Sequence, residues 1–230
     1  MTAENLEAIL NEMLREITII NSNWIMWNGL REEMMEGAKY EEVLKYSPCF
    51  WTVTLNNLLS KTLLGTSKLY DEHKDCLGLK KLINICEQNQ SLFPKNHTVT
   101  YANGYTGEIA HDILQNDIGA NIREAKQKYQ SVQNYRTQLI TLRDKHLAHV
   151  DKNIFLNAKE FYKEVSLKRD ALEKLIKTAG EIANSFLSRL SSTCIHVEYQ
   201  NSDDYKILLR YAKEGKASYL QRIKKSNHET

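Results

Sequence analysis

The chain has 230 residues, and its 31 lysines and arginines against 29 aspartates and glutamates give a net charge of +2. This balance excludes a global field that would hold a nucleic acid, so any phosphate contact has to come from a local basic cluster. The hydrophobic fraction of 42% is ordinary for a globular protein, and only two prolines and nine glycines punctuate the chain. Sheet proteins need more turn-forming residues, so this composition favours long helices.

The four cysteines form no CxxC pair and no zinc-ligand spacing with histidine. We therefore expect reduced thiols, no metal and no cofactor. Charged residues interrupt the first twenty positions, which argues against a signal peptide or a membrane span there. The expected protein is cytoplasmic and has no membrane contact.

Apolar residues at spacings of three and four predict helices in the first half of the chain. The predicted helices run from the N-terminal region to about Met35, closed by Gly37; from Ser47-Pro48 to Tyr70; and, capped by Asp75, through Leu79 to Ile85. Residues 91–116 form a long polar connection, with space for a short helix at Glu108–Leu114.

The second half of the chain predicts a long helix from about Asp117 to His149 and another over Lys159–Leu190, which is either continuous or broken near Ser166. The segment Ile195–Asn201 is compatible with an extended chain, and Asp204–Lys213 predicts a short last helix. The predicted fold is all-α. It is an up-down helical bundle over residues 1–192 with a C-terminal helical extension over residues 193–230.

The inner stripe of the long helix changes composition along its length. Its members are Ile118, Ile122, Ala125, Tyr129, Val132, Arg136, Leu139, Arg143 and His146. Apolar side chains fill the first half of this stripe. In the second half, cationic side chains occupy positions that are expected to face the neighbouring helices. Burial of an unpaired guanidinium is costly. Arg143 and His146 therefore either meet acidic partners on neighbouring helices or line a wet cleft.

An arginine beside histidines is suited to the cleavage of a phosphodiester. The guanidinium of Arg143 can hold a phosphate oxygen and stabilise added negative charge. A histidine can take the 2′-hydroxyl proton or protonate the leaving oxygen. No carboxylate cluster suggests Mg²⁺, so the chemistry would be metal-free. Alternatively, Arg143 pairs with an acidic residue on another helix, and His146 and His149 only decorate a helix end, where the dipole favours cations.

The segment Arg143-Asp144-Lys145-x-x-Ala148-His149-x-Asp151 resembles the Arg-x(4–6)-His signature of the HEPN superfamily, specifically of its abortive-infection (AbiU-like) branch. The Tyr46–Trp51 entry to the second helix and the Leu69–Asp71 sequence before the third are similar in kind and position. This resemblance covers about residues 5–190.

The resemblance implies an endoribonuclease that acts as a toxin or antiphage effector on host or phage RNA. Arg143 would bind and polarise the scissile phosphate, and His149 would be the general acid or base. Asp144 follows the arginine at a position where the superfamily often has asparagine. Members usually work as homodimers whose motifs face each other, and the resemblance leaves room for a cognate antitoxin.

Helical geometry leaves two assignments open. On a straight helix Arg143 and His149 point about 120° apart, so they converge poorly within one chain, and two facing copies would complete each other. His146 lies one turn after Arg143 and is the rival histidine. The second hypothesis is a non-catalytic HEPN dimer that binds RNA, a nucleotide or a partner protein through the same cleft, and the third is a purely structural bundle. The basic residues from Arg210 to Lys225 either track an RNA backbone or form a solvated tail.

Overall fold

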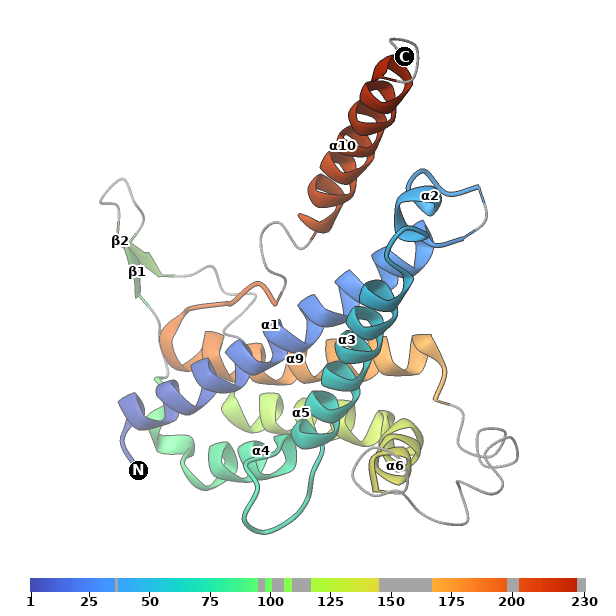
Figure 1. Ribbon diagram of the computed structural model, residues 1–230. Helices are drawn as coiled ribbons and strands as arrows, with labels where there is room; N and C mark the ends of the chain where they lie inside the picture. The colour runs from blue at the N-terminus through green and yellow to red at the C-terminus, as the bar shows by residue number, and fades with distance from the viewer. Residues whose placement is uncertain are drawn as a thin grey trace. The chain divides into compact units, whose positions relative to one another are not determined.

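The computed structural model describes residues 1–35, 37–94, 98–100, 106–108, 117–144, 167–197 and 203–226, and helices occupy most of the described positions at which they are predicted. The all-α prediction is confirmed, and one small hairpin accompanies the helices (Figure 1). The elements are α1 (Ala3–Glu33), α2 (Glu41–Leu44), α3 (Pro48–Leu69), α4 (Leu79–Gln88), a 3₁₀ turn (Gln90–Leu92), β1 (Thr98–Thr100), β2 (Thr106–Glu108), α5 (Ile118–Ser131), α6 (Gln133–Leu142), α9 (Arg169–Ser191) and α10 (Tyr205–Ser226).

The chain divides into two units that do not follow its linear order. Unit 1 consists of residues 1–20 and 63–197, and unit 2 of residues 21–62 and 198–230. Helices α1 and α3 each contribute residues to both units. The division into a bundle over residues 1–192 and an extension over residues 193–230 stays a prediction. None of the described helices is both long and apolar enough to cross a membrane.

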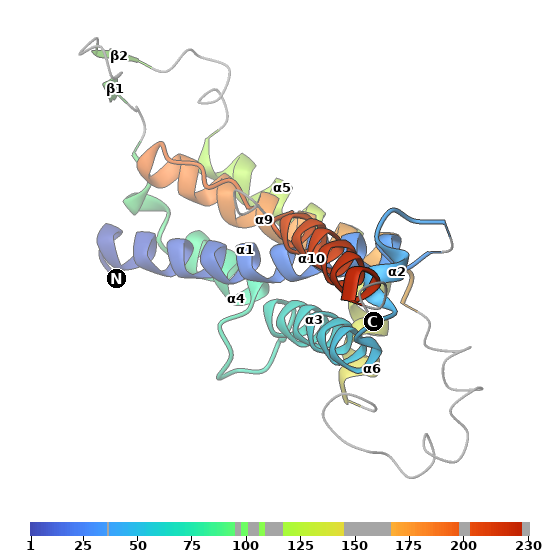
Figure 2. The ribbon, with the colours of Figure 1, turned by 45° about the horizontal axis from the view of Figure 1, so that its top comes forward.

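Helix α9 is the central element of unit 1. It packs against α4, α5 and α6, and α5 runs beside it in two views (Figures 1 and 2). Its buried face includes Leu175, Ile182 and Phe186, all fully buried. After α9 ends at the left-handed Ser192, the amide of Asn184 exchanges hydrogen bonds with the backbone of Ile195 in both directions. The chain therefore folds back along α9 without forming a further helix.

Unit 2 has its own apolar core. Its fully or nearly fully buried members are Leu30, Tyr40, Val43, Leu44, Tyr205 and Leu209. They come from α1, from the short α2 and its preceding residue, and from the first turns of α10. Trp51 is partly buried against this core from α3. Because residues of α1, α2 and α10 share this core, the first turns of α10 are packed and are not a frayed tail.

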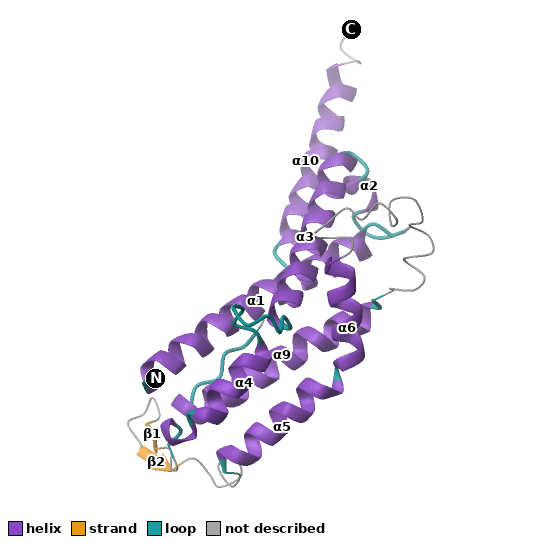
Figure 3. Cartoon of the chain, turned by 90° about the horizontal axis from the view of Figure 1, so that it is seen from below, coloured by secondary structure: helices purple, strands orange, loops and turns teal. Residues whose placement is uncertain are grey.

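The long helix predicted from Asp117 to His149 is interrupted at Val132. Helix α5 ends at Ser131, α6 begins at Gln133, and the two run in different directions (Figure 3). The Ser131 hydroxyl donates to the Lys128 carbonyl, which competes with the helical ladder for that acceptor. Val132 itself is fully buried. The prediction of one continuous helix was wrong, and its last residues, 145–149, lie outside the described part of the chain.

Three other local predictions needed correction. Asp75 does not cap the third helix, because α4 begins at Leu79 and its N-cap position is Gly78. The last helix does not end at Lys213 but continues to Ser226. It includes Gly215, whose low helix propensity is outweighed by the good helix-forming residues around it. The polar connection contains β1 and β2, which pair antiparallel with Val99 opposite Gly107. The proposed helix at Glu108–Leu114 lies outside the described residues except for Glu108, which belongs to β2.

Gly78 and Gly215 form a matched pair for a stability test. A Cβ atom at Gly78 would overlap the carbonyl oxygen of Asp71 and lie 3.0 Å from that of Leu69, whereas one at Gly215 would meet nothing within 4 Å. We expect Gly78→Ala to lower the free energy of unfolding by about 1–3 kcal/mol, because backbone atoms have to move. Gly215→Ala should raise it by about 0.5–1 kcal/mol through helix propensity. Urea unfolding followed by circular dichroism measures both, and equal effects would contradict the packing described for Gly78.

Candidate functional site

Arg143 lies at the end of α6 and contacts two carboxylates. Its Nη1 atom donates to Oδ2 of Asp71 at 2.6 Å, and its Nε atom donates to Oδ1 of Asp144 at 2.7 Å. The Arg143 side chain is 21% exposed. The backbone widens into a π-helical turn at Arg143 and Asp144, a distortion that is frequent at functional sites. The bonds from Arg143 to described residues use Nη1 and Nε, and none of them uses Nη2.

Asp71 is the distant partner of Arg143, 72 residues earlier in the chain. Its other carboxylate oxygen accepts the backbone N–H of His73 at 2.9 Å. This backbone bond, and then the bond from Arg143, hold the pKa of Asp71 below its usual value. The carboxylates of Asp144 and Asp71 in turn raise the pKa of Arg143. The pair is therefore fully charged at any physiological pH.

Glu72, the next residue, holds the second arginine of α6. The guanidinium of Arg136 donates through Nη1 to Oε1 of Glu72 at 3.0 Å and lies 3.8 Å from the centre of the Tyr129 ring. The Tyr129 hydroxyl donates to the same oxygen at 3.0 Å, and Lys80 pairs with the other oxygen at 2.5 Å. Only 6% of the Arg136 side chain is exposed. A buried guanidinium is thus neutralised by one carboxylate and one aromatic face.

Ionisation of this cluster follows from its contacts. Lys80, Tyr129 and Arg136 lower the pKa of Glu72, in that order of importance. Burial raises the pKa of Tyr129, so its hydroxyl stays a donor. Burial also raises the pKa of Tyr70, which stacks on Tyr129 at 5.8 Å between ring centres and donates to the Leu175 carbonyl of α9 at 2.7 Å. The charges and hydroxyl groups of the cluster therefore connect α4, α5 and α6 over the neutral range, and the neutral Tyr70 hydroxyl adds α9.

One short loop positions both arginines. Residues 70–78 connect α3 to α4, and two consecutive side chains of this loop, Asp71 and Glu72, are the carboxylates that hold Arg143 and Arg136. The arginines are seven residues apart, about two helical turns, so they project from the same face of α6. The interruption at Val132 gives α6 its own direction, independent of α5. We call the four residues Asp71, Glu72, Arg136 and Arg143 the double clamp.

The predicted site residues fall into two groups. Arg143 and Asp144 lie in the described part of the chain and contact each other, whereas His146 and His149 lie outside it. The expected acidic partner of Arg143 exists, but it comes from a loop and not from a helix. Asp144 pairs with Arg143 itself.

Sequence reasoning missed Glu72 and the role of Asp71. Asp71 belongs to the Leu69–Asp71 landmark of the resemblance, which implies no role for its carboxylate. The sequence did contain a signal for these ion pairs. The two consecutive carboxylates Asp71 and Glu72 match two arginines of one helix face that are seven residues apart. Among the described residues, no three histidine, cysteine, aspartate or glutamate side chains gather closely enough to hold a metal ion.

Comparison with known proteins identifies the family. The family model of the HEPN type described as AbiU2 matches residues 3–215. The chain belongs to the AbiU2 family. No curated protein and no solved structure matches it. AbiU2 membership makes this a HEPN-domain protein associated with abortive infection, and it confirms the resemblance to the abortive-infection branch of the HEPN superfamily.

Glu72→Gln tests the clamp through its dependence on pH. Glutamine keeps an oxygen for the Tyr129 hydroxyl but loses the charge that faces Arg136. Because the Glu72 side chain is 44% exposed, water screens part of that charge. We expect a loss of about 1–2 kcal/mol in the free energy of unfolding at pH 7.

The loss should shrink in acid. The folded-state pKa of Glu72 lies below its usual value of 4.5. The stability that the carboxylate contributes is therefore complete above about pH 4.5 and disappears as the pH falls through the lowered pKa. Urea unfolding of the wild type and of Glu72→Gln at pH 7 and pH 3 measures the difference. An equal difference at both pH values would show that Glu72 acts by shape and not by charge.

Proposed function

We propose that this AbiU2 protein is a metal-independent endoribonuclease that acts as a toxin or antiphage effector. The observation that carries the proposal is Arg143. In this member of the AbiU2 family, Arg143 follows the buried stripe of α6, is held by two carboxylates and remains partly exposed. The sequence directly after Arg143 contains two histidines, His146 and His149. A structural arginine of unit 1 is available for comparison, because Arg136 is almost completely buried.

The proposed reaction uses the RNA's own 2′-hydroxyl. The 2′-oxygen attacks the neighbouring phosphorus, the bond from phosphorus to the 5′-oxygen breaks, and a 2′,3′-cyclic phosphate and a 5′-hydroxyl result. Arg143 would bind the phosphate and stabilise the charge that builds on it, through the guanidinium edge that includes Nη2. His149 would accept the 2′-hydroxyl proton or donate a proton to the leaving oxygen, with His146 as the rival for this role.

A non-catalytic function is the second candidate, and one observation favours it. Asp71 and Asp144 both pair with Arg143, and their negative charges oppose the approach of a phosphate. A dimer that binds RNA, a nucleotide or a partner protein without cleaving it would tolerate this arrangement. Incubation of the purified protein with mixed RNA, with and without a chelator, separates the two candidates. The proposal requires defined cuts that end in a 2′,3′-cyclic phosphate in both samples.

Arg143→Ala and His149→Ala should each reduce RNA cleavage and growth toxicity by at least about a hundredfold. The arginine would be lost as the phosphate clamp and the histidine as the proton-transfer group. Cleavage of a labelled RNA and far-ultraviolet circular dichroism measure activity and folding in the same preparations.

His146→Ala is the matched control for the histidine assignment. It should retain activity, because the family motif assigns the chemistry to His149. Loss of activity in His146→Ala with retention in His149→Ala would show that the helix-geometry assignment is right. Unfolding of Arg143→Ala would identify the arginine as a structural ion-pair partner only.

A mixing experiment tests the composite site of the proposed homodimer. Arg143→Ala and His149→Ala protein are co-expressed so that subunits exchange at random. Half of the dimers are then mixed, and each mixed dimer holds one intact site if Arg143 of one subunit works with His149 of the other. We expect about a quarter of the wild-type activity from two inactive variants. No recovery, together with a monomer mass in light scattering, would refute the composite site.

A further inference from the structure

Helix α10 concentrates the positive charge of the protein. Between Tyr205 and Ser226 it carries seven lysines and arginines against the single carboxylate of Glu214, a net charge of +6. The whole chain has a net charge of +2, so the other residues together carry −4. Four of the cations follow one another at steps of four, three and three residues and form a stripe along the helix. This basic stripe consists of Lys206, Arg210, Lys213 and Lys216.

Most of the basic stripe has no acidic partner. Lys206 pairs with Asp203 at 3.4 Å, while Lys213 donates to the backbone carbonyl of Lys39 at 3.0 Å and keeps its charge uncompensated. In the part of the chain that the structure describes, no carboxylate forms an ion pair with Arg210, Lys213 or Lys216. Unpaired cations in a row attract a polyanion much more than a single small anion.

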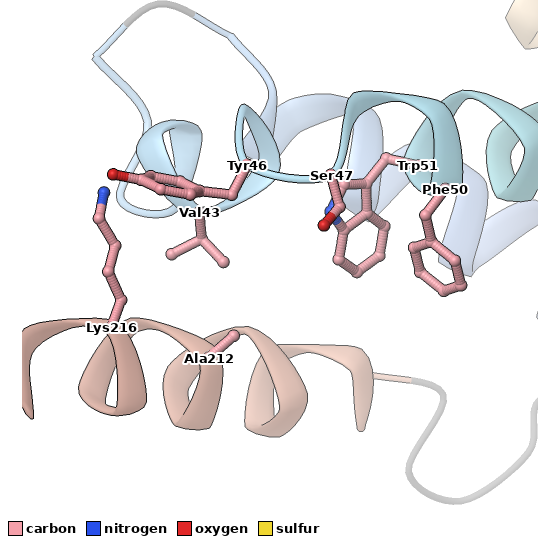
Figure 4. A pocket seen from close by; sticks show the side chains of 7 residues that line it. All are labelled: Val43, Tyr46, Ser47, Phe50, Trp51, Ala212 and Lys216. Carbon is pink, nitrogen blue, oxygen red and sulfur yellow. The ribbon is translucent and has the colours of Figure 1, made fainter. Parts of the chain in front are cut away.

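A pocket of aromatic side chains lies at Lys216 within unit 2. Its volume is about 350 Å³, within the range of small-molecule sites. Figure 4 shows the rings of Phe50 and Trp51 directed toward α10, where Ala212 leaves space, and the Lys216 ammonium beside the Tyr46 ring. The distance from the Lys216 Nζ atom to the centre of the Tyr46 ring is 3.7 Å.

The aromatic side chains of this pocket are unusually exposed. Tyr46 is 63% exposed and Phe50 is 60% exposed, although Trp51 beside them packs partly on the core of unit 2. Phe50 and Trp51 meet edge to face at 4.9 Å between ring centres. Their relative positions are therefore fixed while much of the Phe50 and Tyr46 surface remains open to a ligand. Exposed rings next to lysine are the combination that holds a nucleobase and its phosphate.

We propose that this pocket binds one base of single-stranded RNA and that the basic stripe of α10 binds the adjoining backbone. The binding goes beyond the proposed cleavage, because none of its residues belongs to the double clamp or to the Arg143–His149 segment. The base would stack on Phe50, with the Trp51 and Tyr46 rings lining the pocket around it, and Lys216 would contact the neighbouring phosphate. Arg210 and Lys213 would follow the strand along the helix.

Other occupants fit the observations less well. A lipid surface would lie along the exposed apolar residues of α10 but would not enter a hollow between α10 and the start of α3. A free nucleotide would use the pocket and leave the rest of the basic stripe unused. In a symmetric pair, a second copy of the chain would bring its own net positive helix against this one, which opposes association at the stripe.

Fluorescence anisotropy with a labelled 2′-O-methyl oligouridine of twelve residues tests the proposal on the full chain. This probe cannot be cleaved because the attacking hydroxyl is methylated, so loss of binding and loss of cleavage are read separately. Phe50→Ala and Tyr46→Ala should each weaken binding about tenfold. Lys216→Gln should lower the slope of log Kd against log salt concentration by about 0.7, the value for one phosphate contact on a single strand.

Two variants serve as matched controls. Tyr219 is 61% exposed on the same helix but does not line the pocket, and Lys177 is an exposed lysine of α9. Tyr219→Ala should bind the probe within about twofold of the wild type, and Lys177→Gln should keep the salt slope unchanged. Circular dichroism confirms that each variant is folded.

Several results would overturn the proposal. Wild-type binding by Phe50→Ala and Tyr46→Ala would exclude the pocket, and an equal effect of the controls would reduce the binding to nonspecific charge. Displacement of the probe by uridine monophosphate at equal affinity would indicate a nucleotide site. If the wild type sediments with phosphatidylserine vesicles and Phe50→Ala does not, the pocket binds a membrane surface. If the mass in light scattering depends on Phe50, the pocket binds a second copy of the chain.

Discussion

Two consecutive carboxylates that hold two arginines organise the fold around the candidate site. Glu72 reaches Arg136 across 64 residues of sequence, and Asp71 reaches Arg143 across 72. These contacts hold α6 against the loop between α3 and α4. Local sequence periodicity does not specify contacts between residues so far apart in the chain. Because one arginine is almost fully buried, removal of its carboxylate leaves a charge that water cannot reach. The clamp therefore both connects distant segments and fixes the direction of the helix that carries the motif.

The same clamp places two opposing demands on Arg143. A guanidinium held by two carboxylates has lost its side-chain freedom before a ligand arrives, which makes the binding of a phosphate less costly in entropy. The same carboxylates neutralise part of its charge and weaken its attraction for that phosphate. Arg136, two turns earlier, resolves the corresponding conflict in favour of stability, since Tyr129 covers its flat face. Arg143 is partly exposed, so a phosphate can still reach it. Which of the two opposing effects dominates then depends on the ligand that binds.

The sequence predicted the parts of this arrangement that depend on local periodicity. The apolar stripes located most of the long helices, and the entry of cations into one stripe correctly identified Arg143 as a residue that needs an acidic partner. The match of two consecutive carboxylates to two arginines seven residues apart was a signal for the partner, but it does not fix the contact, because Asp71 and Glu72 lie on a loop whose path depends on the packing of α4. The interruption at Val132 has no proline or glycine to indicate it. The Asn103-Gly104 pair within the polar connection is a hairpin signal that the helical interpretation overlooked.

The separation of charge between α10 and the rest of the chain has a consequence for handling the protein. The basic helix carries +6 and the remainder of the sequence −4, so the small net charge of the chain is the difference between two larger, opposite charges. At low ionic strength, the helix of one copy attracts the acidic remainder of another, and the copies associate nonspecifically. Salt near physiological strength shortens the range of this attraction to about 8 Å and keeps the copies apart. Dilute buffers are therefore the conditions in which we expect this attraction between copies to be strongest.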